Sequence, residues 1–236
     1  MTERKIAFYD IDRTSYQGLL IKDLIKYQLT TGTLSKETFD AINNEEELYK
    51  RGKLYEDMAQ DMLVHLAKGL TGKKISELEE ETSRFFKTPE GNKFFSFVGE
   101  SIQMLKLTHD TYFITAEPQY VAKEVLRIHG ATDFISTLFE ITENGVITGR
   151  ISVSLAKKEN KGIRVRQLML THAHEHSFAF GDSDGDIEML EEVENPVCIN
   201  PNDELKKKAT EKNWEIKKPE EVLLFVKSKL PKTDCL

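Results

Sequence analysis

The stretch that decides the fold of this chain is FYDIDRT, residues 8–14. It completes an apolar run, IAFY, of the kind that forms a buried strand. Reactive groups in open α/β sheets collect just beyond the carboxyl ends of strands. Because side chains alternate along an extended chain, Asp10 and Asp12 can lean to one side and share a cation. Acids also begin ordinary turns, so this segment alone leaves both interpretations open.

Three further segments favour the chemical interpretation. Near the other end, FAFGDSDGD, residues 178–186, is again an apolar run that breaks into glycine and acids. Between the two acidic segments lies YFIT, residues 112–115, an apolar run that ends in a hydroxyl, and Lys161 opens a helical pattern. Four elements in this order resemble the haloacid dehalogenase (HAD) superfamily of phosphatases, most closely its phosphoserine-phosphatase-like branch, subfamily IB.

Hydrophobic spacing predicts two architectural parts. Apolar residues recur at helical intervals from about residue 16 to residue 87, with almost no strand signal. From residue 92 onward strands and helices alternate, and Asn144-Gly145 predicts a β-hairpin. We therefore expect an α/β fold with a Rossmann-like, doubly wound, mostly parallel sheet formed by residues 1–15 and 92–236. An all-helical cap, residues 16–91, would be inserted after the first strand, where the resembled family places its mobile cap.

Composition restricts the partners and the compartment. The 33 basic and 40 acidic residues give a net charge of −7, which argues against nucleic acid as the main partner. No apolar run approaches the roughly 20 residues that cross a membrane. Cys198 and Cys235 lack metal-site spacing and are typical of free thiols in a reducing compartment. Because an apolar strand begins so close to Met1, we expect no secretory signal. We expect a cytoplasmic protein with neither a nucleic-acid nor a membrane partner, and the sequence does not predict its oligomeric state.

The resemblance implies roles for the catalytic residues. Asp10 would be the nucleophile that forms an aspartyl-phosphate. Asp12 would protonate the leaving group and then activate water, which requires a pKa above the ordinary value near 3.9. Lys161 would pair with the nucleophile and the phosphate, and Lys157 and Lys158 remain alternatives to it.

Phosphate and metal contacts follow from the same resemblance. Thr115 would donate to a phosphate oxygen, and a helix opening just after it would add amide donors. Mg²⁺ would bind Asp10, Asp182 and the backbone carbonyl of Asp12, with Asp186 as a ligand or as the partner of a metal-bound water. Three alternating histidines, at positions 172, 174 and 176, could bind zinc or nickel, but an exposed loop entering a strand is the favoured interpretation.

The expected substrate is a small phosphorylated metabolite. Phosphoserine phosphatases carry an acid shortly after the first motif, whereas here the next acid after Asp12 is Asp23, so we expect no strong phosphoserine preference. Tyr49, Arg51 and Lys53 in the predicted cap are candidate substrate-binding residues. Two alternatives remain, a phosphotransferase of the same fold and a non-catalytic phosphate-binding or receiver-like module. The acid pair and the long helical insertion argue against a receiver.

Overall fold

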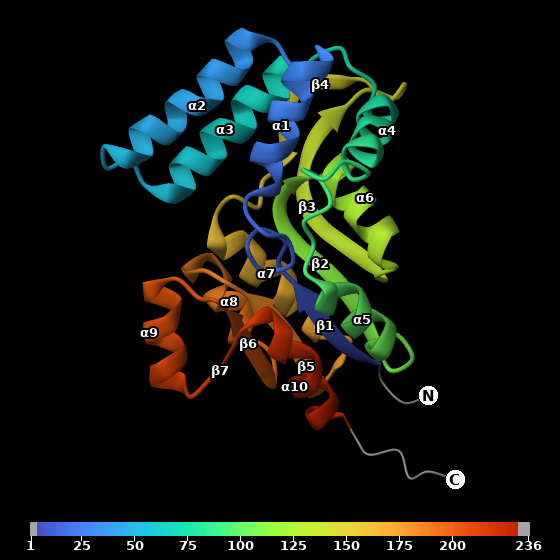
Figure 1. The fold of residues 1–236 in the computed structure, drawn as a ribbon, viewed down its shortest axis with the longest axis vertical. Helices are drawn as coiled ribbons and strands as arrows, with labels where there is room; N and C mark the ends of the chain where they lie inside the picture. The colour runs from blue at the N-terminus through green and yellow to red at the C-terminus, as the bar shows by residue number, and fades with distance from the viewer. Residues whose placement is uncertain (1–3, 231–236) are drawn as a thin grey trace.

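The computed structural model describes residues 4–230. A seven-stranded sheet in the order β4-β3-β2-β1-β5-β6-β7 crosses the molecule, and β4 alone among the named strands pairs antiparallel (Figure 1). The strands are β1 (Lys5–Tyr9), β2 (His109–Pro118), β3 (Asp133–Ile141), β4 (Ile147–Val153), β5 (Ala173–Gly181), β6 (Asn195–Ile199) and β7 (Glu215–Lys217). The predicted doubly wound, mostly parallel α/β sheet is confirmed. β1 lies at its centre, where the strand order reverses direction.

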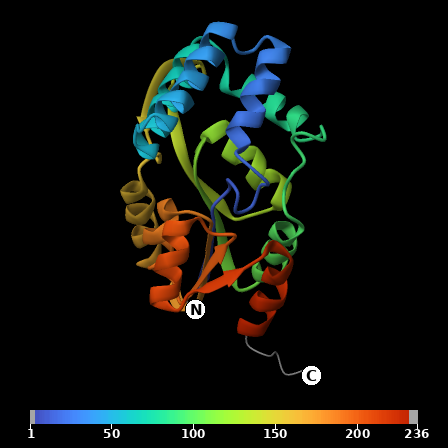
Figure 2. The same ribbon diagram turned by 60° about the vertical axis from the view of Figure 1, so that its left-hand side comes forward.

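Helices cover both faces of the sheet (Figure 2). One face carries α5 (Ser96–Leu105), α6 (Gln119–His129) and α10 (Val222–Lys229), and the other carries α7 (Lys158–Met169), α8 (Ile187–Leu190) and α9 (Asp203–Lys212). The side chains of β1 alternate between the two layers: Ala7 and Tyr9 pack with the first set of helices, Ile6 and Phe8 with the second. A strand covered on both sides reads as a continuous apolar run, as the sequence of β1 does.

Four helices follow β1. They are α1 (Leu20–Thr31), α2 (Lys36–Lys50), α3 (Tyr55–Gly69) and α4 (Ile75–Phe85). Gly32 ends α1 in the left-handed conformation, with φ 76°, and the Ser35 side chain accepts a hydrogen bond from the Thr38 amide at the start of α2. All four lie inside the range predicted for the cap, although the boundaries of that insertion stay a prediction.

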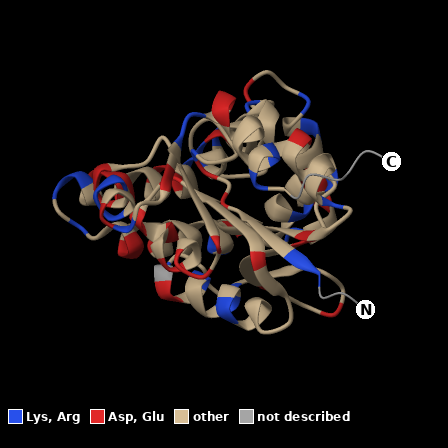
Figure 3. Cartoon of the chain, turned by 90° about the horizontal axis from the view of Figure 1, so that it is seen from below, with Lys and Arg blue, Asp and Glu red and all other residues tan. Residues whose placement is uncertain are grey.

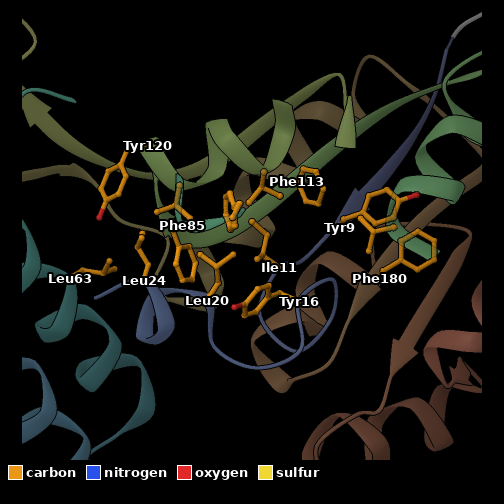
Figure 4. Packing of buried hydrophobic residues seen from close by; sticks show 14 of the residues in the cluster. Tyr9, Ile11, Tyr16, Leu20, Leu24, Leu63, Phe85, Phe113, Tyr120 and Phe180 are labelled. Atoms are coloured by element: carbon orange, nitrogen blue, oxygen red, sulfur yellow. The ribbon is translucent and has the colours of Figure 1, made fainter. Parts of the chain in front are cut away.

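Apolar packing joins these helices to the rest of the molecule. α3 packs against β4 and α4 against α6. Figure 4 shows one cluster that continues from Tyr9 and Phe180 in the sheet, through Ile11, to Leu24 of α1 and Leu63 of α3. The inserted helices are therefore held to the sheet by buried side chains as well as by the chain itself.

Several elements are longer than hydrophobic spacing predicts. β2 continues through Pro118, β5 begins at Ala173, and α7 begins at Lys158. The added residues at the start of β5 are largely exposed, so they show no apolar periodicity. The hairpin around Asn144-Gly145 is confirmed, with Gly145 at φ 72°.

The surface carries both signs of charge. Figure 3 shows Lys and Arg segments interspersed with Asp and Glu segments. The helices within residues 4–230 fall short of the length and apolar character that a bilayer-spanning helix requires. Cys198 is a buried free thiol, and Cys235 lies outside the described residues.

Candidate active site

The carboxyl ends of β1, β2 and β5 meet at one edge of the sheet. Tyr9 of β1 pairs in register with Phe113 of β2 and with Phe180 of β5. Asp10 and Asp182 follow these strands, so parallel pairing places them side by side. The structure brings Asp10, Asp182 and Asp186 together, with one carboxylate oxygen of each within 4.8 Å of the others.

Lys161 lies among these acids. Its Nζ is 2.6 Å from Asp10 Oδ1 and 2.9 Å from Asp186 Oδ1, and all three side chains are buried. The helix that Lys161 was expected to open begins three residues earlier, so Lys161 lies in the first turn of α7. The exposed Lys157 caps that helix outside the cluster, while the side chain of Lys158 is not among the described parts of the structure.

Hydrogen bonds position Asp10 from both sides. Its backbone amide donates to the Phe180 carbonyl at 3.0 Å, and its own carbonyl accepts from Ser15 Oγ at 2.6 Å. Thr14 Oγ1 donates to Asp182 Oδ1 across 3.4 Å. The loop after β1 is thereby connected to the loop after β5.

The loop after β5 holds Asp186 against the cluster. Asp186 Oδ2 accepts hydrogen bonds from the backbone amides of Asp182 and Ser183, at 3.1 and 3.2 Å. Gly181 allows this closeness, because a Cβ there would lie 2.5 Å from Asp186 Cβ. The tight loop thus depends on Gly181 and Ser183, whereas a Cβ at Gly185 would meet only Ser183 Oγ, at 3.4 Å.

Three carboxyl groups are buried beside the single ammonium group of Lys161, which neutralises only part of their negative charge. Burial, opposed by Lys161 and reinforced by Asp186, raises the pKa of Asp10 to about 7. Burial and the charges of Asp186 and Asp10 raise the pKa of Asp182 to about 9. Burial alone would lower the pKa of Lys161, but the charges of Asp10 and Asp186 outweigh it and raise the value. A cation held by carboxylate oxygens would lower the pKa of each acid, and this donor set fits Mg²⁺.

Asp12 contacts the first residue of α1. Its Oδ1 accepts from the Leu20 amide at 2.7 Å. Burial raises the pKa of Asp12 to about 6, although the Leu20 amide opposes the rise. A pKa raised in this direction is what the acid role of Asp12 requires, and that role stays a prediction.

Glu117 is a member of the site that the sequence analysis missed. It is buried near the end of β2, and its Oε1 accepts from the Ile21 amide at 2.9 Å. Burial and the charge of the neighbouring Asp12 hold the pKa of Glu117 well above its usual range. The available signal was an acid two residues beyond Thr115, on a strand that continues past the predicted end.

Thr115 lies at the same edge, buried in β2. Its Oγ1 accepts from the Glu117 amide at 3.1 Å. The helix expected just after Thr115 is α6, which begins at Gln119 with Pro118 at its N-cap, and the role of its amides as phosphate donors stays a prediction. The phosphate contact of Thr115 stays a prediction.

Arg51 and Lys53, the candidate substrate-binding residues of the helical insertion, form no ion pair with Asp10, Asp12, Asp182 or Asp186 within the described residues. Arg51 is exposed at the end of α2, and Lys53 Nζ pairs with Asp61 at 2.6 Å and with Glu45. Neither of these cations lines the cavity that opens beside Asp12. Tyr55 does line it, and partial burial together with the charge of Asp12 raises the pKa of its hydroxyl. Tyr55 was not predicted, since a tyrosine that opens a helix has no distinctive spacing.

The alternating histidines lie at the opposite edge of the sheet, by the start of β5. His172 Nε2 is 3.2 Å from Asp110 Oδ2, and His174 is exposed. Within residues 4–230 they form no metal-ligating group. The non-metal interpretation is favoured.

Comparisons with known proteins find a family model and curated relatives that match this chain. A family model for haloacid dehalogenase-like hydrolases matches residues 7–191. The histidinol-phosphatase of Neisseria meningitidis is 24% identical over 224 residues, covering 90% of this chain and 98% of that protein. The phosphoserine phosphatase SerB1 of Mycobacterium tuberculosis is 27% identical over 220 residues, covering 89% of this chain and 70% of that protein.

Solved structures share the fold. A protein of unknown function from Bordetella pertussis superposes with a TM-score of 0.77 at 24% identity, covering 92% of this chain and all of that one. A phosphoserine phosphatase, as an analogue of its phospho-aspartyl intermediate, superposes with a TM-score of 0.65 at 16% identity, covering 95% and 99%. At these identities the likeness is one of architecture.

Proposed function

Because the chain belongs to the haloacid dehalogenase-like hydrolase family, we propose that it is a Mg²⁺-dependent phosphatase that acts on a small phosphomonoester through an aspartyl-phosphate at Asp10. The observation that carries the proposal is the position of Lys161, within hydrogen-bonding distance of both Asp10 and Asp186 in a buried acidic cluster. The phosphatase names of the curated relatives support the same reaction class.

The first half-reaction transfers the phosphoryl group to the protein. Lys161 engages Asp10 Oδ1, which leaves the second carboxylate oxygen to attack phosphorus. The new Asp10 O–P bond forms as the ester P–O bond breaks. The departing alkoxide takes a proton from Asp12, whose pKa of about 6 leaves part of the population protonated near neutral pH.

The second half-reaction regenerates the enzyme. Asp12, now a carboxylate, takes a proton from water, and the resulting hydroxide attacks phosphorus. The Asp10–phosphorus bond breaks and inorganic phosphate leaves. Thr115 and Lys161 would hold the phosphoryl oxygens through both steps, as neutral and charged donors.

The carboxylates of Asp10, Asp182 and Asp186, with the backbone carbonyl of Asp12, would hold the metal ion. When bound, Mg²⁺ would neutralise charge on the phosphoryl oxygens. The buried excess of negative charge at this edge supports its presence.

A generic aryl phosphate provides the test. We expect phosphate release that requires Mg²⁺, stops with excess EDTA and is absent in Asp10→Asn. Asp203→Asn makes the same chemical change at an exposed residue of α9 and should retain full activity. Full activity in excess EDTA would remove the metal from the proposal, and turnover by Asp10→Asn would remove the nucleophile.

A further inference from the structure

A cavity lies between helices α1, α2 and α3 and the end of β2. It contains about 600 Å³ of space free of protein atoms, part of it open to solvent. Asp12 and Glu117 form its wall on the side of the sheet. Apart from these acids, Lys22 and Tyr55, the lining side chains are all apolar, among them Met62 of α3.

The cavity offers little to a charged ligand. Lys22 is the one cation among the described residues that line it, and Lys22 pairs with Glu46. The carboxyl groups of Asp12 and Glu117 offer an anion no cationic partner. Burying an ammonium or carboxylate among apolar side chains is unfavourable unless a partner compensates it.

The cavity also reaches Asp12, the predicted general acid. Asp12 is both a lining residue and the group that would protonate the leaving oxygen. Glu117 Oε2 is buried, and no N–H or O–H group within residues 4–230 donates to it. The leaving group is attached at the ester oxygen that Asp12 would protonate. It would therefore extend from Asp12 between the apolar faces of α1 and α3.

We propose that this cavity binds the leaving group, so that the preferred substrate is the phosphate monoester of an uncharged alcohol with an apolar body. This inference rests on the proposed phosphatase function and adds the class of alcohol. Removal of apolar surface from water then supplies the selectivity, while the carboxylate of phosphoserine would enter a cavity in which Lys22, the one cation among the described lining residues, is already paired with Glu46.

Straight-chain alkyl phosphates from ethyl to hexyl test the proposal on the unaltered protein with Mg²⁺. Each buried methylene contributes about 0.8 kcal/mol, so kcat/KM should rise about fourfold per carbon until the cavity is filled. O-phosphoserine and O-phosphoethanolamine, which also release primary alcohols, should give values at least about tenfold below that of butyl phosphate.

Two variants test whether the rise along the alkyl series arises in this cavity. Met62→Gln places an amide on the cavity wall and should flatten the rise along the alkyl series. Met104→Gln makes the same change at a partly buried methionine of α5, outside the cavity, and should leave the rise unchanged. Thermal unfolding of both variants verifies that they are folded.

The outcomes separate this inference from the proposed function. Hydrolysis of aryl phosphate together with a flat alkyl series, or with a preference for phosphoserine or phosphoethanolamine, would overturn the apolar leaving-group site alone. Equal flattening in Met62→Gln and Met104→Gln would also overturn it. No phosphate release from any ester would instead reject the proposed phosphatase function.

Discussion

Lys161 is the buried cation between Asp10 and Asp186. Its side chain is 10% exposed, and those of the two acids are 8% and 1% exposed, so water compensates little of their charge. Removing one partner of such a group leaves buried charge unpaired. The geometry therefore distinguishes Lys161 from Lys157, a choice that the sequence left open.

Lys161→Gln should lower kcat/KM for an aryl phosphate by roughly 10²- to 10³-fold, the usual effect of removing one electrostatic donor. Lys157→Gln is the matched control, because Lys157 is exposed, and its activity should stay within about twofold of the unaltered protein. Steady-state phosphate release measures both. A larger loss in Lys157→Gln than in Lys161→Gln would reverse the assignment.

Asp12 is distinguished from Asp10 by its surroundings. Asp12→Asn cannot donate a proton, so the loss should depend on the leaving group and reach roughly 10²- to 10⁴-fold for an alkyl ester. An aryl ester with an acidic phenol needs little protonation and should still release up to one equivalent of phenol per enzyme, measured in a rapid burst. Alkyl ester turnover at the unaltered rate would rule out the acid–base role.

At the scale of elements, the end of β5 controls where Asp186 lies. Gly181 is the last residue of the strand, and its missing side chain lets Asp186 fold back onto the amides of the following turn. Those amides give Asp186 little freedom to move. A side chain at Gly181 would therefore displace the acid rather than be accommodated.

Gly181→Ala should reduce kcat/KM by about 10²-fold or more, since displacements near 1 Å have such effects on catalysis. Gly99→Ala is the control: a Cβ there would meet only His129 Nδ1 at 3.6 Å, and alanine favours helix α5 by up to about 1 kcal/mol. Steady-state kinetics should give kcat/KM, and urea unfolding the stability, of both variants. Unchanged activity in Gly181→Ala would show that Asp186 need not hold this position.

At the scale of the whole molecule, the acidic cluster couples stability to pH. In the metal-free protein the pKa values of Asp10, about 7, and Asp182, about 9, exceed the ordinary 3.8. A raised pKa contributes stability that is complete below the ordinary value and is lost as pH rises through the raised one. The metal-free protein should therefore become less stable between about pH 4 and about pH 9.

Mg²⁺ should reverse this loss, because it binds the ionised carboxylates. At a concentration about 100 times its Kd the ion adds roughly 2.7 kcal/mol, or roughly 5–10 °C in Tm for a chain of this size. Calorimetric scans across this pH range should show a Mg²⁺-induced increase in Tm that grows with pH. Asp182→Asn should lose that increase and Asp203→Asn should keep it. An increase of equal size at every pH would contradict the coupling.

The sequence by itself determined the elements and the chemical character of the site. Alternating and helical spacings are local, so the central strand, the four inserted helices and the hairpin at Asn144-Gly145 were predictable. The acids after β1 and β5 were predictable as well, because parallel strands bring their carboxyl ends to one edge. A strand covered on both faces has a continuous apolar sequence, and β1 has one.

Only the tertiary structure decided which distant side chains complete the site. Lys161 meets Asp10 across 151 positions of sequence, and Glu117 lies beside Asp12 from a neighbouring strand. The cavity beside Asp12 is formed by α1, α2, α3 and β2 together, with Tyr55 on its wall. Such contacts depend on how the helices pack over the sheet edge, and no local spacing in the chain records that arrangement.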